Sequence, residues 1–268
     1  MFKILTLSLL LLVPAAFAEH HHHPDHGLGN NHDHFGDGEF QTALEGKTLH
    51  VYAHGKLLVN WNDYQSHQVR HGVIGLLDTL GEFEAYDTTG KKIVAHWKDT
   101  DEYVMSDEVI ALQDTKGIFD AYRYDGTPIV RNYTKTKDFF IRRAFVGILD
   151  TDGVFDAYDL AGKRIIANWR DVVDLQVLSD MIVLRDKAGI LDAYNGNGTA
   201  IVRNFTKTKS FVARRGMLAA LDTDGILQIF NRAGQEMLHV TGVSALEPDA
   251  HGARYYRNGS WASFSIER

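Results

Sequence analysis

Seven of the fourteen histidines in this 268-residue chain lie in one short stretch near the N-terminus. Neutral imidazole is a good ligand for Cu(II), Ni(II) and Zn(II), and nearby carboxylates can add oxygen donors. We therefore expect this stretch to bind such an ion through some of the residues Glu19, His20, His21, His22, His23, His26, His32 and His34. If the chain is cleaved after Ala18, His21 becomes its third residue. A free α-amine, two backbone amides and a third-position imidazole suit Cu(II) or Ni(II) in square-planar geometry.

A secretory leader precedes this stretch in residues 1–18. Lys3 supplies the positive start, residues 4–13 are apolar, and Ala16-Phe17-Ala18 forms a small-x-small cleavage site. The sequence therefore predicts a periplasmic or secreted protein, cleaved near Ala18. Residues 19–38 have no apolar periodicity, which predicts an arm without regular structure. The alternative to metal binding is that the arm is a solvated tail, which gains positive charge below about pH 6.5 as its histidines are protonated.

The composition excludes several classes of function. A net charge of −7 gives no general attraction to nucleic acid or to anionic lipid. The absence of cysteine excludes disulfides, thiolate metal sites, a cysteine nucleophile and a lipid-carrying cysteine. No second apolar stretch approaches the length of a membrane span. We expect a monomer with a protein partner in the cell envelope.

A 36-residue repeat organises residues 39–268. Aspartates recur at this spacing, as do aromatic residues that close each unit, at Asp78, Asp114, Asp150, Asp186 and Asp222 and at Trp61, Trp97, Tyr133, Trp169 and Phe205. A fixed period of this size is typical of solenoids, propellers and similar arrays. The fourth unit contains four short runs rich in β-branched and aromatic residues, Ala144–Leu149, Val154–Tyr158, Lys163–Trp169 and Asp171–Leu178. These runs, split by glycine-containing turns, predict an all-β propeller of four-stranded antiparallel blades.

The residues from Gly147 to Trp169 resemble the PQQ-like propeller repeat. They contain an apolar strand, Asp-Gly, an aliphatic strand ending in Ala-Tyr-Asp, then Gly-Lys, an aliphatic pair and Trp. Ala85 to Lys91 matches the same repeat closely, and the resemblance covers about residues 45–240. The family's quinone-dependent dehydrogenases carry adjacent cysteines over the cofactor, and this chain has none. The resemblance therefore implies the blade structure of the family without a required cofactor. It places the chain nearer to the non-enzymatic bacterial propellers that bind other proteins.

A second, longer period bears on the number of blades. Residues 117–143 and 189–215 are 72 positions apart and share 18 of 27 residues, so the junctions between units alternate in charge. An alternating ring closes without a mismatch only on an even number of blades, which favours six over seven. We expect the ring to be closed by its terminal strands, with Ala253–Arg257 or Trp261–Ile266 completing the blade begun by Leu49–Val59.

Two further sets of repeated residues have competing interpretations. The pairs Arg142-Arg143 and Arg214-Arg215 are expected to form ion pairs between units, or else a docking surface for a partner. A polar residue precedes each closing aromatic, at Asn60, His96, Asn132, Asn168 and Asn204. These side chains are expected to satisfy backbone groups between blades, or else to line a channel.

Catalysis has little support in the sequence. Thirty-six residues holding four strands leave short connections and no insertion that could build a pocket. Turns such as Asp150-Thr-Asp-Gly153 lack the further ligands of a calcium loop and have the chemistry of tight hairpins. The function expected is therefore a non-catalytic protein-binding scaffold. A metal-binding protein that uses the histidine-rich arm is the first alternative, and an enzyme acting in the propeller channel is the second.

Overall fold

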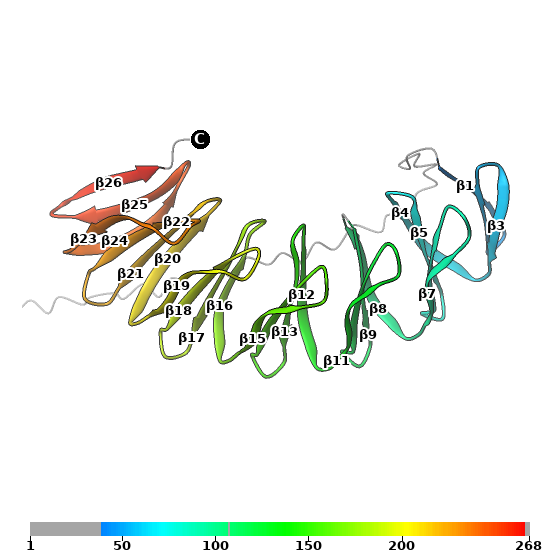
Figure 1. The fold of residues 1–268 in the computed structure, drawn as a ribbon, viewed down its shortest axis with the longest axis horizontal. Coiled ribbons are helices and arrows are strands. Elements are labelled where there is room, and N and C mark those ends of the chain that lie inside the picture. The colour runs from blue at the N-terminus through cyan, green and yellow to red at the C-terminus, as the bar shows by residue number, and fades with distance from the viewer. Residues whose placement is uncertain (1–38, 107, 266–268) are drawn as a thin grey trace, which may run out of the picture. The chain divides into compact units, whose positions relative to one another are not determined.

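A computed structural model of the chain describes residues 39–106 and 108–265. The leader and the histidine-rich arm lie outside these residues. The described part contains 26 strands in seven antiparallel sheets (Figure 1). It contains no helix long and apolar enough to cross a membrane. The prediction of an all-β chain of repeated antiparallel sheets is confirmed.

Five of the sheets have four strands, and the first and seventh have three. The first sheet contains β1 (Phe40–Glu45), β2 (Thr48–Ala53) and β3 (Lys56–Trp61). The second contains β4 (Tyr64–Arg70), β5 (Val73–Asp78), β6 (Phe83–Asp87) and β7 (Lys92–Trp97). The third contains β8 (Thr100–Ser106), β9 (Val109–Asp114), β10 (Phe119–Arg123) and β11 (Pro128–Tyr133). The fourth contains β12 (Thr136–Arg142), β13 (Phe145–Asp150), β14 (Phe155–Asp159) and β15 (Arg164–Trp169).

The remaining sheets follow the same order along the chain. The fifth contains β16 (Val172–Val177), β17 (Met181–Asp186), β18 (Leu191–Asn195) and β19 (Ala200–Phe205). The sixth contains β20 (Thr208–Arg214), β21 (Met217–Asp222), β22 (Leu227–Asn231) and β23 (Glu236–Val240). The seventh contains β24 (Val243–Asp249), β25 (Gly252–Arg257) and β26 (Ser260–Ser265).

Two predictions about the sheets were wrong. The number of sheets is seven, not six. The run Asp171–Leu178, expected to complete the fourth blade, forms β16, which pairs with β17 and opens the fifth sheet. Each closing aromatic therefore ends the last strand of a sheet, and the following run begins the next sheet.

The expected sharing of a blade between the two ends of the chain is also contradicted. β25 and β26 pair with each other and with β24 instead of completing the sheet of β2 and β3. Asn258 and Gly259, with φ of 52° and 81°, connect β25 to β26 as a two-residue hairpin. An Asn-Gly turn with positive φ at both residues favours a local hairpin. Closing this short loop costs less entropy than bringing together the two ends of the chain.

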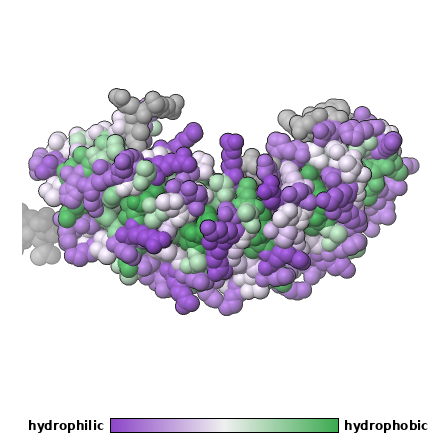
Figure 2. All heavy atoms as spheres, viewed as in Figure 1, coloured by the Kyte–Doolittle hydropathy of each residue, from purple (hydrophilic) through white to green (hydrophobic). Residues whose placement is uncertain are grey.

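Hydrophobic cores lie between successive sheets. The core between the fourth and fifth sheets, for example, contains Phe145, Phe155, Ile182 and Leu184, all fully buried. Comparable clusters join each other pair of neighbouring sheets. In the view of Figure 2, hydrophobic residues lie in the body of the sheets and hydrophilic residues cover the turns. Each inner sheet is thus covered on both faces, which explains why most residues of its two central strands are buried.

The aspartates that repeat every 36 residues are turn residues. Asp150 Oδ1 accepts hydrogen bonds from the amides of Asp152 and Val154 at 2.9 and 2.7 Å. Asp78 and Asp114 accept equivalent bonds in the second and third sheets. A side chain that binds amides two and four positions ahead fixes the turn. The tight-hairpin interpretation is therefore confirmed for these turns.

Candidate functional site

A row of buried carboxylates runs through the second to fifth sheets, one in the third strand of each. The four side chains are 36 residues apart and belong to residues no more than 8% exposed, Glu84, Asp120, Asp156 and Asp192. Sequence analysis did not single them out. Their signal was present, since each precedes an Ala-Tyr pair at the repeat period. Buried carboxylates require partners, and these partners explain much of the repeat.

Each of the three buried aspartates binds the backbone of the last strand of its own sheet. Its Oδ1 accepts the N–H of Asn132, Asn168 or Asn204, at 2.5 to 2.7 Å. These asparagines have φ of 52–53° and lie at β-bulges. Asparagine tolerates this left-handed conformation better than most residues. The asparagine side chains were expected to satisfy backbone groups between blades, but the hydrogen bonds found at these positions use the asparagine N–H and an aspartate side chain of the same sheet.

The same carboxylates connect neighbouring sheets. The Tyr133 hydroxyl donates to Asp156 Oδ2 at 3.0 Å, and Trp169 Nε1 donates to Asp192 Oδ2 at 3.2 Å. Within the fifth sheet, the Tyr194 hydroxyl also donates to Asp192. Burial, followed by this hydrogen bond and the charge of Asp192, raises the pKa of Tyr194 to about 12. The closing aromatics of the third and fourth sheets thus bind the acid of the next sheet, whereas the buried indole nitrogens of Trp61 and Trp97 have no hydrogen-bond partner among the described residues.

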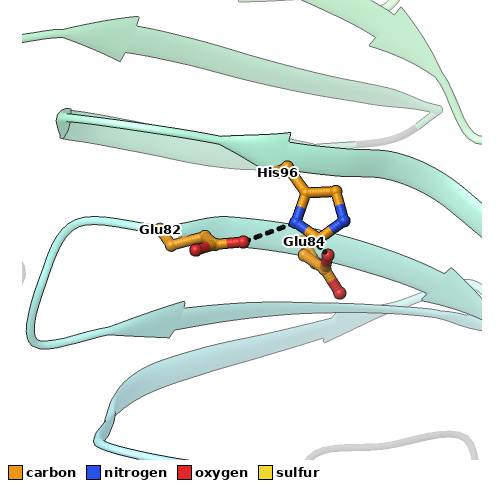
Figure 3. Close-up of side chains that lie close together, drawn as sticks. All are labelled: Glu82, Glu84 and His96. Atoms are coloured by element: carbon orange, nitrogen blue, oxygen red, sulfur yellow. Dashed lines mark hydrogen bonds and ion pairs between the residues drawn. The ribbon is translucent and has the colours of Figure 1, made fainter.

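The second sheet departs from this pattern at three positions that lie together (Figure 3). Where the third to fifth sheets have an aliphatic residue, an aspartate and an asparagine, it has Glu82, Glu84 and His96. The corresponding residues of the third sheet are Ile118, Asp120 and Asn132. Because the other sheets fold without these three residues, the repeat architecture alone does not account for them. We take this cluster as the candidate functional site.

The cluster combines one nitrogen donor and two carboxylates. His96 Nδ1 lies 2.6 Å from Glu82 Oε1 and 3.2 Å from Glu84 Oε1, and the three potential ligand atoms lie within 4.8 Å of one another. The side chain of Glu84 is 3% exposed, while that of His96 is 66% exposed. An imidazole with two carboxylates suits a divalent ion such as Zn(II), and the exposed ring leaves room for water ligands.

Two other groups already compensate the charge of Glu84. Lys92 Nζ lies 2.7 Å from Glu84 Oε1, and the Tyr86 hydroxyl donates to Glu84 Oε2. Burial, followed by the hydrogen bond to Glu84, raises the pKa of Tyr86 well above its usual value. A bound cation would therefore have to displace Lys92, whose side chain is 42% exposed and free to turn toward solvent.

The arginine pairs are placed differently from one another. Arg142 is half-buried and donates to the carbonyls of Ile141 and Val177, and burial lowers the pKa of its guanidinium. Arg143, Arg214 and Arg215 are exposed. The expected ion pairs between units are absent at all four arginines, among the residues that the structure describes. The reason is that Arg142 binds the Ile141 carbonyl of its own strand and the Val177 carbonyl of the fifth sheet, while the other three arginines are exposed to solvent.

Hairpin turns of three sheets meet at a surface depression of about 470 Å³. It is lined by His71, Glu108, Val109, Arg142, Arg143 and Leu160. Arg214 and Arg215 do not line it. Of the two predicted arginine pairs, only Arg142-Arg143 therefore meets other polar and charged side chains in this depression. The depression combines cationic, anionic and apolar side chains, which is the mixture typical of the rim of a protein–protein contact.

No protein-family profile and no curated protein matches the sequence. Several solved structures are similar to the structure of this chain over much of its length. The computationally designed Ika8 protein has 14% identity and a TM-score of 0.36, covering 84% of this chain and 82% of its own. BamB from Moraxella catarrhalis has 13% identity and a TM-score of 0.34, covering 87% and 82%. Hsv2p from Kluyveromyces lactis has 13% identity and a TM-score of 0.36, covering 72% and 71%. These scores are low, so the function proposed below rests on the residues of this chain.

Proposed function

We propose that this chain is a non-catalytic, propeller-type docking scaffold that binds an acidic protein of the cell envelope. The observation that carries the proposal is the set of exposed arginines at Arg143, Arg214 and Arg215. They lie at corresponding hairpins of the fourth and sixth sheets, and no ion pair joins them to another described residue. The leader pattern of residues 1–18 supports an address in the periplasm or outside the cell.

Several other charged residues of the repeat have structural partners. At the opposite ends of the strands, exposed ion pairs join the links between sheets to neighbouring turns, as in Lys135–Asp152 and Lys207–Asp224. The buried carboxylates are used by bulges and by aromatic hydroxyl or indole groups. The exposed arginines, which form no ion pair with a described residue, are therefore available to meet a partner, and a guanidinium suits bidentate contact with carboxylates.

Charge reversal at the arginines tests this proposal. We expect Arg214→Glu with Arg215→Glu to weaken binding of the envelope partner about tenfold or more, because a like charge replaces each attractive one. The mature chain is immobilised, envelope proteins are fractionated over it, and the partner is identified and its affinity measured by calorimetry. The matched control is Lys98→Glu with Arg170→Glu, which reverses two exposed cations at the opposite ends of the strands. Equal losses in the two variants would contradict docking at the arginine hairpins.

Metal binding is a second candidate function, and the Glu82–Glu84–His96 cluster favours it. The histidine-rich arm, Glu19 to His34, remains a proposed site for Cu(II), Ni(II) or Zn(II) of its own. The cluster adds an independent proposal within the described sheets, because its three donors replace residues that no other full sheet replaces together. Two proposed sites on one chain can be separated by deleting one and mutating the other.

Changing the cluster to the residues of the third sheet separates the two sites. We expect Glu82→Ile with His96→Asn to weaken Zn(II) binding to a chain that begins at Gly36 by about tenfold or more. The variant should fold, because Ile118 and Asn132 occupy the same positions beside a buried acid. Calorimetric titration with Zn(II) compares four proteins: the chain beginning at Gly36 and the full mature chain, each with and without the two substitutions. Absence of Zn(II) binding in the chain beginning at Gly36 would show that the cluster is not a metal site.

A further inference from the structure

The outermost strands at the two ends of the array differ from every other edge strand. Each full sheet has two edge strands, and the pairing of all ten contains a register shift. The pairings of β3 and β24 in the terminal sheets contain one too. Only β1 and β26 form uninterrupted ladders with their neighbours. Because bulges twist an edge away from further pairing, these two edges alone lack that protection.

These edges also lack the side chains that usually block strand addition. β1 reads Phe-Gln-Thr-Ala-Leu-Glu, with five of its six residues exposed. β26 reads Ser-Trp-Ala-Ser-Phe-Ser, likewise with five of six exposed. The two strands contain one charged residue between them, Glu45, and neither lysine nor proline. Lysine, proline and inward charges are the common means of protecting an edge.

Each terminal sheet lacks one strand, and the missing strands are different. Trp61 ends β3 as Trp97 ends β7, so the first sheet lacks the strand that corresponds to β4. The Val243 amide binds the Gly225 carbonyl as the Thr208 amide binds that of Gly189, so β24 corresponds to β20. The seventh sheet therefore lacks the strand that corresponds to β23. The open edges are β1 at one end and β26 at the other, each six residues long.

We propose that the partner of these edges is a second copy of this chain, with β1 of one copy hydrogen-bonded to β26 of the next. The two strands match in length, carry no opposing like charges and expose the unpaired donors and acceptors of regular ladders. The contact is head-to-tail, so it leaves one open edge at each end of a dimer and permits longer assemblies. It does not depend on the docking function, and it departs from the monomer expected from the sequence.

Charge at the middle of each strand tests the pairing in the full mature chain. Ala43 and Ala262 are exposed residues of β1 and β26. Sedimentation velocity over a range of concentrations should show association of the wild type. Ala43→Lys with Ala262→Lys places like charges across the new ladder and is expected to raise the Kd about fivefold or more. Ala43→Lys with Ala262→Glu should restore the wild-type Kd.

The rescue distinguishes head-to-tail pairing from the alternatives. Pairing of β1 with β1, or of β26 with β26, would leave like charges together in the Lys–Glu variant, and association would stay weak. A wild type that is monomeric at every concentration would overturn the proposal, including the case in which the two edges pair within one chain. Ala167→Lys is the matched control, because Ala167 is an exposed alanine on the bulged edge strand β15. It should leave the Kd unchanged, and circular dichroism verifies that all variants fold.

Discussion

Replacing Asp156 by alanine is expected to lower the free energy of unfolding by about 3 kcal/mol. The carboxylate is 2% exposed and accepts the Asn168 N–H at 2.7 Å and the Tyr133 hydroxyl at 3.0 Å. Alanine leaves both donors without their acceptor at the boundary of two sheets. It also removes the counter-charge that lies 3.5 Å from Arg164. The loss is larger than that of an exposed ion pair because both donors are shielded from water.

The measurement is equilibrium urea denaturation followed by fluorescence. Asp152→Ala is the matched control, because Asp152 is an exposed aspartate of the same sheet and pairs with Lys135 at the surface. Exposed pairs of this kind contribute little, so the control should unfold near the wild-type midpoint. Equal shifts for the two alanine variants would show that the buried carboxylate does not join the sheets. Partial unfolding of single sheets is expected to broaden the transition of Asp156→Ala, since each sheet contacts only its neighbours.

Replacing Gly147 by valine is expected to destabilise the fourth sheet by about 2 to 3 kcal/mol. A Cβ at Gly147 would lie 2.9 Å from Cζ of Phe155, a fully buried ring on the adjacent strand. The fifth sheet solves the same packing differently, with Val183 and Leu191 at these two positions, both fully buried. The second sheet repeats the glycine solution, since a Cβ at Gly75 would lie 2.7 Å from the Phe83 ring.

Phe155→Leu is therefore expected to rescue Gly147→Val. A smaller side chain opposite the valine restores the volume balance that the fifth sheet shows. A double-mutant cycle in urea should give a coupling energy of about 1 to 2 kcal/mol in favour of the pair. Additive losses would mean that the backbone of β13 moves to admit the valine, and that the glycine serves another purpose. Gly147→Ala should destabilise the sheet less than Gly147→Val. The third sheet already has an alanine and a phenylalanine at these two positions, Ala111 and Phe119, both fully buried.

The candidate site was only partly visible in the sequence. His96 belonged to a recognised set of polar residues, but Glu82 and Glu84 were not grouped with it. His96 lies 14 positions after Glu82 and 12 after Glu84, and the three meet because β6 and β7 pair with a bulge at His96. Arg142 was expected to form an ion pair between units or part of a docking surface, but its guanidinium donates to the Val177 carbonyl of the next sheet. Neither outcome could be derived from residue types alone.

The sequence by itself determined the features that depend on short-range chemistry. Glycine-containing turns, short runs of β-branched and aromatic residues and a 36-residue period predicted antiparallel strands and tight hairpins, because these follow from backbone geometry within a few residues. Only the tertiary structure decided which strands share a sheet. β16 lies between two candidate partners, and it pairs with β17 through a local hairpin closed by the Leu178 amide and the Met181 carbonyl.

The tertiary structure also decided the number of sheets and the pairing of the terminal strands. The residue pattern of a strand allows it to pair with either neighbouring strand. The choice of partner therefore depends on the entropy of the connecting loop and on which face of the strand can be buried in a core. At the ends of this chain the short hairpins at His54-Gly55 and Asn258-Gly259 decide it. They give two separate three-stranded sheets and leave the edges of β1 and β26 open.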